Sequence, residues 1–394
     1  MPRTVERVWE GDPGAMGGRR SRATFRYSAF VPDPIADIAP AVPFATARSA
    51  ADAESAIEAL NHRGSVAGLE AIGPLLLRSE AVASSRLEGY DVSSLNLARA
   101  LVDPRAARGS ARTVAANVSA MEEAIAIGDR DDPITIDDLL AIHRVLMAGD
   151  DKARPGELRT EQNWLGGRLD SPLDARYIPP PEGEVRPLML DLVSFLARDD
   201  LPAVAQAAVA HAQFETIHPF RDGNGRVGRC LVHVVLRRRG VAPRFVPPVS
   251  IVLAARPSAY IDGLVGFREG KIAEWIASFS AAAGLAASAS VRLAGQVEQL
   301  QAAWFERAGR PRAGSAAARI IGVLPALPIL SAPTARVAIG TSQQKTLSAL
   351  KELADAGVLR QISEGTYDRQ YAAIELFDLV TAYEASVAAP EHAV

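Results

Sequence analysis

Apolar residues recur with helical spacing along most of the chain, and this pattern predicts a mainly α protein. Residues 49–60 place their apolar side chains on one face, with Ser49 as a candidate N-cap. A second helix is predicted from Pro74 to Leu87, because proline suits a first helical position and Gly89 follows the end. Further helices are predicted over residues 115–127, 134–147 (capped by Thr135), 188–197 and 203–215, and then through about residue 300.

Two regions depart from the helical pattern. Residues up to about 45 are rich in Gly, Pro and Arg and predict an arm without its own core. Between Arg154 and Pro187, glycines and prolines interrupt the chain, and Ala175–Ile178 is a short strand candidate. The prolines that follow cannot donate to a β-ladder, so this strand should lie at an edge.

A C-terminal winged helix-turn-helix is predicted over residues 315–394, after the linker-like run 309–314. Helices over 316–324, 334–339 and 341–356 precede a hairpin whose turn contains Glu364 and Gly365. The third helix should present Leu347, Leu350, Leu353 and Ala354 on one face. Its few lysines are balanced by acids, so DNA binding and protein interaction or dimerisation both stay open.

Composition narrows the class of protein. With 48% hydrophobic and 23% charged residues, the 394-residue chain is typical of a globular protein. A net charge of −3 argues against a mainly nucleic-acid-binding or membrane-surface protein. Cys230 is the single cysteine, which excludes an intrachain disulfide and favours a cytoplasmic location. No signal-peptide core is expected in the first residues. No uninterrupted apolar run is long enough to span a bilayer, so no membrane partner is expected.

Residues 218–229 bring together the largest group of candidate catalytic and phosphate-binding residues. Their sequence is His-Pro-Phe-Arg-Asp-Gly-Asn-Gly-Arg-Val-Gly-Arg. Pro219 and the glycines should end the preceding helix at His218, and the next helix should follow the loop. The His218 imidazole, neutral near pH 7, can accept the proton of a hydroxyl. Asp222 offers a carboxylate to Mg²⁺, which binds through one or two carboxylates and substrate phosphates.

The same residues predict a phosphate site. Backbone amides at a helix N-terminus bind anions, glycine permits close approach, and guanidinium groups make bidentate contacts to phosphates. Predicted phosphate contacts come from Gly223, Asn224, Gly225, Arg226 and Arg229. A zinc site is disfavoured because the spacing H-E-x-x-H is absent, and His211 and His233 are predicted to be core or helix-face residues.

Residues 218–229 match the signature of the Fic family (filamentation induced by cAMP), H-P-F-x-[DE]-G-N-G-R-x-x-R, at every specified position. The resemblance extends over about residues 115–283. It implies a Fic-type helical core and transfer of AMP from ATP to a Ser, Thr or Tyr hydroxyl of a target protein. By this resemblance Asp222 holds Mg²⁺ on the α- and β-phosphates, and Arg229 binds the γ-phosphate.

A second motif, Ser84-Ser85-Arg86-Leu87-Glu88-Gly89, resembles the inhibitory motif of Fic proteins, [ST]-x-x-x-E-[GN]. Ser84 and Glu88 share a face if the helix continues through both. A Glu88 carboxylate presented to Arg229 would occupy the γ-phosphate position and autoinhibit the enzyme. The alternative is a solvated glutamate at a helix end.

Two further candidates concern the target and the nucleotide. Arg176, Tyr177 and Ile178 fall where the family has a flap that docks its target by main-chain pairing. An ordinary surface hairpin is the alternative. Tyr260 falls where family members often contact adenine, although a core or surface aromatic explains it as well.

The resulting hypothesis is a protein adenylyltransferase that uses ATP and Mg²⁺ and is restrained by Glu88. The predicted divisions are an arm (1–45), an inhibitory helical segment (46–112), a Fic core (113–285), a helix and linker (286–314) and the winged helix. Removal of AMP, or transfer of another phosphate-containing group, are alternatives within the same site. A DNA-binding regulator with a nucleotide-sensing core is the alternative of another class. The target, self-modification and homo-oligomer formation stay open.

Overall fold

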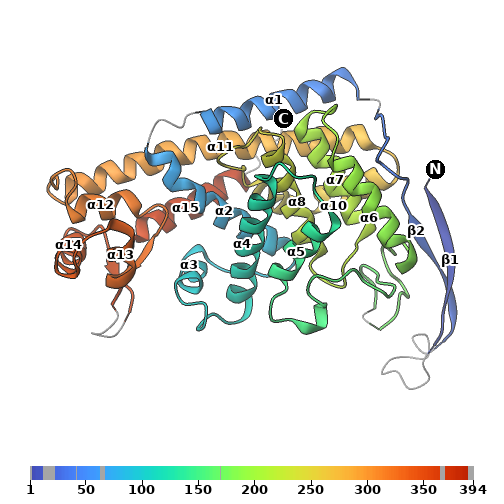
Figure 1. Cartoon of the computed structure of the whole chain (residues 1–394), viewed down its shortest axis with the longest axis horizontal. Coiled ribbons are helices and arrows are strands. Elements are labelled where there is room, and N and C mark those ends of the chain that lie inside the picture. Colours follow the sequence, from blue (N-terminus) through green and yellow to red (C-terminus); the bar gives the residue numbers. More distant parts are fainter. Residues whose placement is uncertain are drawn as a thin grey trace. The chain divides into compact units, whose positions relative to one another are not determined.

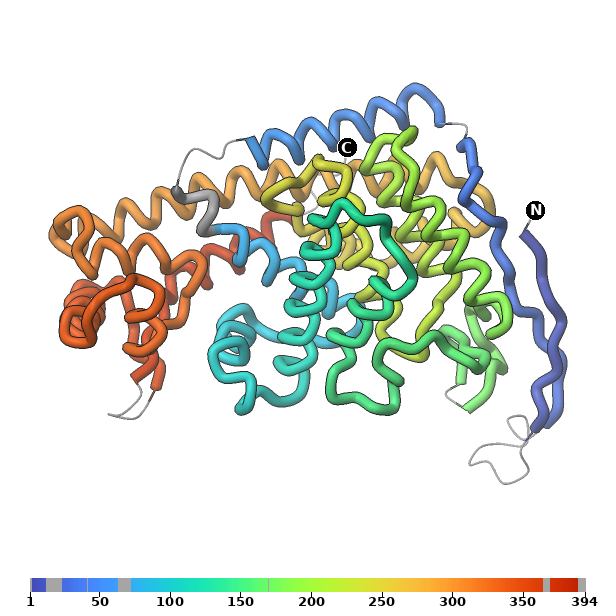
Figure 2. Tube along the Cα trace, viewed as in Figure 1, coloured from blue at the N-terminus to red at the C-terminus, as the bar shows by residue number. Residues whose placement is uncertain are grey.

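The computed structural model describes residues 2–11, 23–40, 42–62, 67–168, 170–363 and 369–388 (Figures 1 and 2). The fold is mainly helical, as predicted. The helices up to the predicted catalytic loop are α1 (Phe44–His62), α2 (Ala67–Leu87), α3 (Ser94–Val102), α4 (Gly109–Gly128), α5 (Ile136–Leu146), α6 (Glu182–Leu196) and α7 (Ala203–Ile217). Those after it are α8 (Asn224–Arg238), α9 (Val249–Ala255), α10 (Pro257–Arg268), α11 (Ile272–Arg307), α12 (Ala316–Val323), α13 (Ala332–Ile339), α14 (Gln343–Asp355) and α15 (Ile374–Ala388).

Several helices begin before their predicted starts: α4 begins at Gly109 and α6 at Glu182, where residues 115 and 188 were expected. In α1 and α2 the early start passes through a residue that was expected to mark the boundary. Ser49 lies inside α1 and does not cap it, because the residues from Phe44 onward already continue the helix. Pro74 lies inside α2, which begins at Ala67. A proline is tolerated within a helix at the loss of one backbone hydrogen bond, so its preference for the first position did not fix the start. Thr135 does cap α5, through a reciprocal capping box with Asp138.

The chain folds into two compact units, each assembled from three segments. The first comprises Met1–Ala50, Ser119–Arg239 and Ile261–Ser280. The second comprises Ala51–Val118, Gly240–Tyr260 and Ala281–Val394. The five predicted divisions stay predictions.

The first unit is built around α7, whose residues are all buried except Glu215. Helix α7 packs against α6 and α8, and α5 packs against α6 and α8. The indole of Trp275 donates to the Ala208 carbonyl oxygen at 2.7 Å, which fixes the start of α11 on α7. A helix buried on all sides explains why α7 lacks the polar face of a surface helix.

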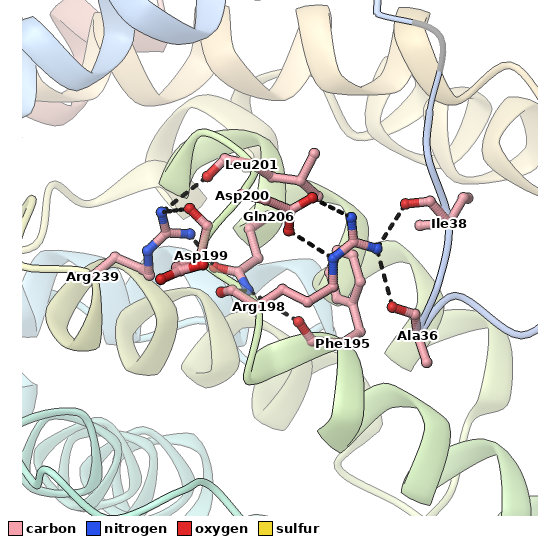
Figure 3. A network of polar contacts seen from close by, with 9 residues as sticks. All are labelled: Ala36, Ile38, Phe195, Arg198, Asp199, Asp200, Leu201, Gln206 and Arg239. Atoms are coloured by element: carbon pink, nitrogen blue, oxygen red, sulfur yellow. Dashed lines mark hydrogen bonds and ion pairs between the residues drawn. The ribbon is translucent and has the colours of Figure 1, made fainter.

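Hydrogen bonds connect the turn between α6 and α7 to neighbouring segments of the chain (Figure 3). The fully buried Gln206 amide donates to the Arg198 carbonyl oxygen at 2.8 Å, and its oxygen accepts from Arg239 at 2.7 Å. Arg198 donates to the carbonyl oxygens of Ala36 and Ile38 at 3.0 and 2.7 Å. These bonds join the N-terminal segment, the turn and the end of α8.

The N-terminal residues form a β-hairpin that was not predicted. Strands β1 (Arg3–Trp9) and β2 (Phe25–Val31) pair antiparallel over their whole length (Figure 1). Arg3 and Arg7 bind Glu184 and Glu182 of α6 at 2.7 and 2.6 Å. The hairpin is therefore stabilised by α6, a tertiary contact that the Gly-, Pro- and Arg-rich composition did not reveal.

The C-terminal part of the second unit contains the three predicted helices and the two strands of the predicted hairpin, and it adds strand β3 (Ile329–Ser331), which was not predicted. Helix α12, strand β3, helices α13 and α14, and strands β4 (Arg360–Gln361) and β5 (Gln370–Ala372) follow in sequence. The antiparallel sheet has the order β3-β5-β4. The predicted turn at Glu364 and Gly365 lies outside the described residues. Of the apolar residues predicted on one face of α14, Leu350 and Leu353 are buried, whereas Leu347 is 49% exposed.

Helix α11 is long and apolar enough to cross a bilayer by length and composition, unlike the expectation that no such run exists. Within the described residues, 56% of its most apolar window is buried inside the protein. More than half of the most apolar part of α11 therefore packs inside the protein.

Candidate active site

His218 lies at the C-cap of α7 in the left-handed conformation, with φ 51° and ψ 60°. Its N–H donates to the Phe214 carbonyl oxygen at 2.9 Å. This confirms that His218 ends the helix. Left-handed backbone is unfavourable for a residue with a side chain and persists only where its surroundings hold it. The following contacts supply that restraint.

Arg159 holds the backbone of the His218 loop, a role that was not predicted from the sequence. Its guanidinium donates to the carbonyl oxygens of His218 at 2.9 Å and Pro180 at 2.6 Å. The backbone N–H of Arg159 donates to the Pro219 carbonyl oxygen at 2.9 Å. Only 4% of Arg159 is exposed, and burial lowers its pKa to about 10, so it stays charged at neutral pH. A lone arginine between glycines and prolines carries no pattern that indicates burial.

His143 of α5 holds the other side of the loop. The Gly156 N–H donates to its Nδ1 at 3.0 Å, so Nε2 carries the proton and donates to the Asp222 carbonyl oxygen at 3.1 Å. The ring stacks on Phe220 at 3.8 Å between centroids, with 4° between planes. Burial lowers the pKa of His143 to about 4, which keeps this tautomer neutral at pH 7.

The phosphate end of the site is the start of α8. Gly223 occupies the N-cap position with φ 79°, and no side chain caps the helix there. A Cβ on Gly223 would lie 3.0 Å from the Met147 sulfur, so both backbone and space require glycine. The first amides of a helix have no intrahelical acceptor, and together with the helix dipole they favour an anion.

The Asn224 side chain stabilises the loop through hydrogen bonds to its backbone. Its oxygen accepts from the Phe220 N–H at 2.8 Å, and its amide nitrogen donates to the Phe220 carbonyl oxygen at 2.9 Å. These two bonds close the loop between Phe220 and the first turn of α8. A phosphate contact by Asn224 is therefore expected through its backbone amide.

The two signature arginines bring positive charge into the first turns of α8. Arg226 and Arg229 are each 2% exposed. One Arg226 nitrogen lies 3.9 Å from Oδ1 of Asp222, whose side chain is 55% exposed. Buried guanidinium groups beside helix amides favour a polyanion such as a nucleotide phosphate chain.

Asp222 fits a Mg²⁺ ion that is shared with a phosphate substrate. Its carboxylate is largely exposed, and its Oδ1 accepts from the Gly223 N–H at 2.6 Å. Among the described residues, no group of three or more His, Cys, Asp or Glu side chains could hold a metal. One carboxylate suffices for Mg²⁺ when phosphate oxygens and water complete the shell.

The predicted flap is a short hairpin closed by a single bridge. Tyr177 pairs with Leu165 as an isolated bridge, so the strand predicted over 175–178 is wrong in extent. The Tyr177 hydroxyl donates to the Thr216 carbonyl oxygen at 2.7 Å, and Arg268 lies 3.9 Å from the ring centroid. Burial raises the pKa of the Tyr177 hydroxyl. The Ile178 carbonyl oxygen accepts from the Phe30 N–H of β2, and Arg176 is exposed.

A pocket of about 650 Å³ opens beside this hairpin, also within the first unit. Its walls include Trp9 and Trp164, whose rings meet edge to face at 5.6 Å. Arg159, Arg168 and Arg221 line it, and Glu161 is the acidic lining residue. Arg221 belongs to the His218 loop, so the pocket adjoins the candidate site. The pocket could not be predicted from the sequence because Trp9, one of its walls, belongs to strand β1, which was not expected.

In the second unit, the predicted inhibitory motif ends α2 with a Schellman motif. The Tyr90 N–H donates to the Ser85 carbonyl oxygen, and the Gly89 N–H donates to Arg86, each at 3.0 Å. Gly89 has φ 83°, the left-handed conformation that this motif requires. The geometry places Glu88 at the C-cap, where its side chain is exposed.

The residues around Glu88 are anchored by burial. Ser84 is fully buried, unlike Glu88, so the two do not share one exposed face. Asn117 of α4 donates to the Ala81 carbonyl oxygen and to the Ser85 hydroxyl, each at 3.1 Å. Tyr260, the candidate adenine contact, is 9% exposed.

Comparisons with known proteins agree with the loop signature. Residues 133–236 match the Fic/DOC family. "Protein adenylyltransferase Fic" of Culex quinquefasciatus is 35% identical over 151 residues, which is 38% of this chain and 27% of that protein. "Protein adenylyltransferase fic-1" of Caenorhabditis elegans is 32% identical over 119 residues, 29% of this chain and 22% of that protein. The chain thus spans about a quarter of the length of these relatives.

Solved structures show the same fold. A Fic family protein from Desulfovibrio desulfuricans aligns with a TM-score of 0.53 and 23% identity, covering 85% of this chain and 98% of that one. A Fic domain containing signaling protein from Bacteroides thetaiotaomicron also gives 0.53, with 18% identity and coverage of 63% and 97%. At these identities the likeness concerns the fold alone.

His211, fully buried in α7, should make stability depend on pH. Burial and the nearby charge of Arg229 lower its pKa from 6.5 to about 3. The unfolded chain therefore binds a proton as pH falls below 6.5, while the folded chain does not. We expect a loss of about 1.4 kcal/mol between about pH 7.5 and about pH 5.5 from this residue.

Urea unfolding of wild type and His211→Gln at both pH values measures this effect. The glutamine variant should lack that part of the pH dependence. An equal loss of stability in both proteins would contradict the assignment.

Proposed function

Residues 133–236 are a Fic/DOC family domain, and on this premise we propose that the chain is a protein adenylyltransferase. The observation that carries the proposal is the adjacency of a fixed histidine and an uncapped helix N-terminus. His218 ends α7, Gly223 begins α8, and the loop between them is held by Arg159 and His143. A base therefore lies one short loop away from an anion site.

The proposed reaction joins the target hydroxyl oxygen to the α-phosphorus of ATP. The bond between that phosphorus and the oxygen of the pyrophosphate group breaks, and the electron pair leaves with pyrophosphate. The His218 imidazole takes the hydroxyl proton. Amides at the start of α8, with Arg226 and Arg229, hold the phosphates and stabilise charge that develops on the oxygens. Mg²⁺, held by Asp222, would supply positive charge at the phosphates when bound.

Inhibition by Glu88 is part of the proposal. The Schellman motif fixes the backbone of Glu88 at the end of α2, and its exposed carboxylate is a suitable partner for a guanidinium. We propose Arg229 as that partner in the resting protein. Pairing would exclude the γ-phosphate and turn the α-phosphate away from attack.

Docking of the target is proposed at the hairpin of Tyr177 and the adjoining pocket. Three arginines and one glutamate line the pocket, so its lining carries an excess of positive charge. Two tryptophan rings supply apolar walls. We propose that the target presents an acidic segment, with a carboxylate in this pocket, while its hydroxyl reaches His218.

Replacement of His218 tests the base. His218→Ala should abolish transfer of label from α-labelled ATP, because no other group takes the proton, while ATP affinity changes little. Filter binding of ATP and labelling of the protein measure the two effects. Retained labelling in a folded variant would show that another base acts.

Replacement of Glu88 tests inhibition. Glu88→Gly should raise self-labelling by about tenfold or more, in line with loss of a charge-assisted pair worth about 1.5–3 kcal/mol. Asp91→Asn is a matched control, since Asp91 is an exposed carboxylate that pairs with Arg86 of the same motif. Equal rates for Glu88→Gly and wild type would rule out Glu88 as the restraint.

Replacement of Arg168 tests docking. In the Glu88→Gly background, Arg168→Glu should lower labelling of lysate proteins several-fold, because it reverses a charge in the pocket lining. ATP binding should stay unchanged, since Arg168 lies outside the 218–229 loop. Labelling of the same proteins at undiminished intensity would exclude the pocket as the docking site.

A further inference from the structure

One face of α7 carries three ionisable residues in a row. His211, Glu215 and His218 are separated by four and three positions, which places them on the same side of the helix. The row runs into the C-cap that presents His218. Glu215 is thus the neighbour of His218 on α7.

The Glu215 carboxylate faces the imidazole of His218. Its Oε2 lies 4.0 Å from His218 Nδ1, and the two side chains are 12% and 13% exposed. Such low exposure limits screening by water, so a charge here acts on the ring more strongly than at the surface. The oxygen is within ion-pair distance of a ring nitrogen that becomes charged when the base takes a proton.

Packing of α8 on α7 places this carboxylate. A Cβ at Gly228 of α8 would lie 2.6 Å from Glu215 Oε1 and 3.2 Å from His211 Nδ1. Glycine at this position is therefore what makes room for the carboxylate between the helices. Gly228 falls at a position that the family signature leaves unspecified, so the motif alone gives no reason for it.

Most other charges around His218 are positive. Arg159 donates to its carbonyl oxygen, and Arg226 and Arg229 lie in the first turns of α8. Arg221 of the loop is paired with Glu161 at 3.2 Å, which offsets its charge. His211 is neutral, and Asp222 lies in the loop with its carboxylate 3.9 Å from Arg226. Nearby cations oppose protonation of an imidazole, so a base in this setting needs an anion beside it.

We propose that Glu215 is a positioning residue for His218, and this inference rests on the proposed function. Its carboxylate engages Nδ1, leaves Nε2 directed to the target hydroxyl, and stabilises the imidazolium that forms. The hydroxyl proton moves to Nε2 of His218 and stays there until product release, and Glu215 remains ionised. The arrangement follows the general logic in which a base is oriented by a third group.

The decisive experiment is an NMR titration of the histidine ring protons, which needs no substrate. Glu215→Gln keeps the shape of the side chain and removes its charge. The pKa of His218, assigned by comparison with His218→Ala, should fall by about one unit in Glu215→Gln. An unchanged His218 pKa would overturn the inference. Glu122→Gln, an exposed carboxylate change on α4, should leave the His218 titration as in wild type.

Kinetics in the Glu88→Gly background extend the test. Glu215→Gln should lower kcat about tenfold, move the acidic limb of the pH–rate profile down by about one unit, and change KM for ATP less than twofold. Glu215→Asp, which keeps the charge, should recover part of the pKa and of kcat. A fall in kcat without a shift of the profile would assign Glu215 a merely structural role and overturn the inference.

The two proposals fail separately. If the Glu88→Gly parent transfers no AMP to itself or to lysate proteins, the proposed function fails, whatever the NMR titration shows. If the parent transfers AMP but Glu215→Gln shifts neither the His218 pKa nor the profile, the function stands and the role of Glu215 is refuted.

Discussion

The site depends on holding one histidine in an unfavourable backbone conformation between two buried helices. His218 adopts left-handed φ and ψ at the end of α7, and Gly223 does the same before α8. Arg159 holds the carbonyl oxygens on one side of the loop, and His143 stacks and donates on the other. Because these braces come from the buried interior, the loop amides are preorganised for an anion. Catalysis on this account follows from rigidity around a single proton acceptor.

Local patterns in the sequence predicted the loop that carries His218 and the helix boundaries beside it. Pro219 and the glycines indicated the helix end, and the capping box at Thr135 fixed the start of α5. The signature arginines are at the first turns of α8. These features are set within a few residues of one another, so propensity and spacing are sufficient to predict them.

What the sequence did not predict depends on distant partners. Arg159 and His143 act on the loop across 59 and 79 positions, and no periodicity links such pairs. The hairpin of β1 and β2 depends on ion pairs with α6. Ser49 and Pro74 carried the right local preference, yet neighbouring residues continued both helices through them. Tertiary contact overrides local preference in each case.

Transfer of AMP from ATP by this loop can be tested by parallel labelling with α- and γ-labelled ATP. The Glu88→Gly protein and the same protein with His218→Ala would be incubated with each label and a cell lysate. After subtraction of the label found in lysate alone, stable protein label is expected from α-labelled ATP only, and His218→Ala should abolish it. Label from the γ-phosphate above the level of lysate alone, or α-label that survives loss of His218, would contradict transfer of AMP by this loop.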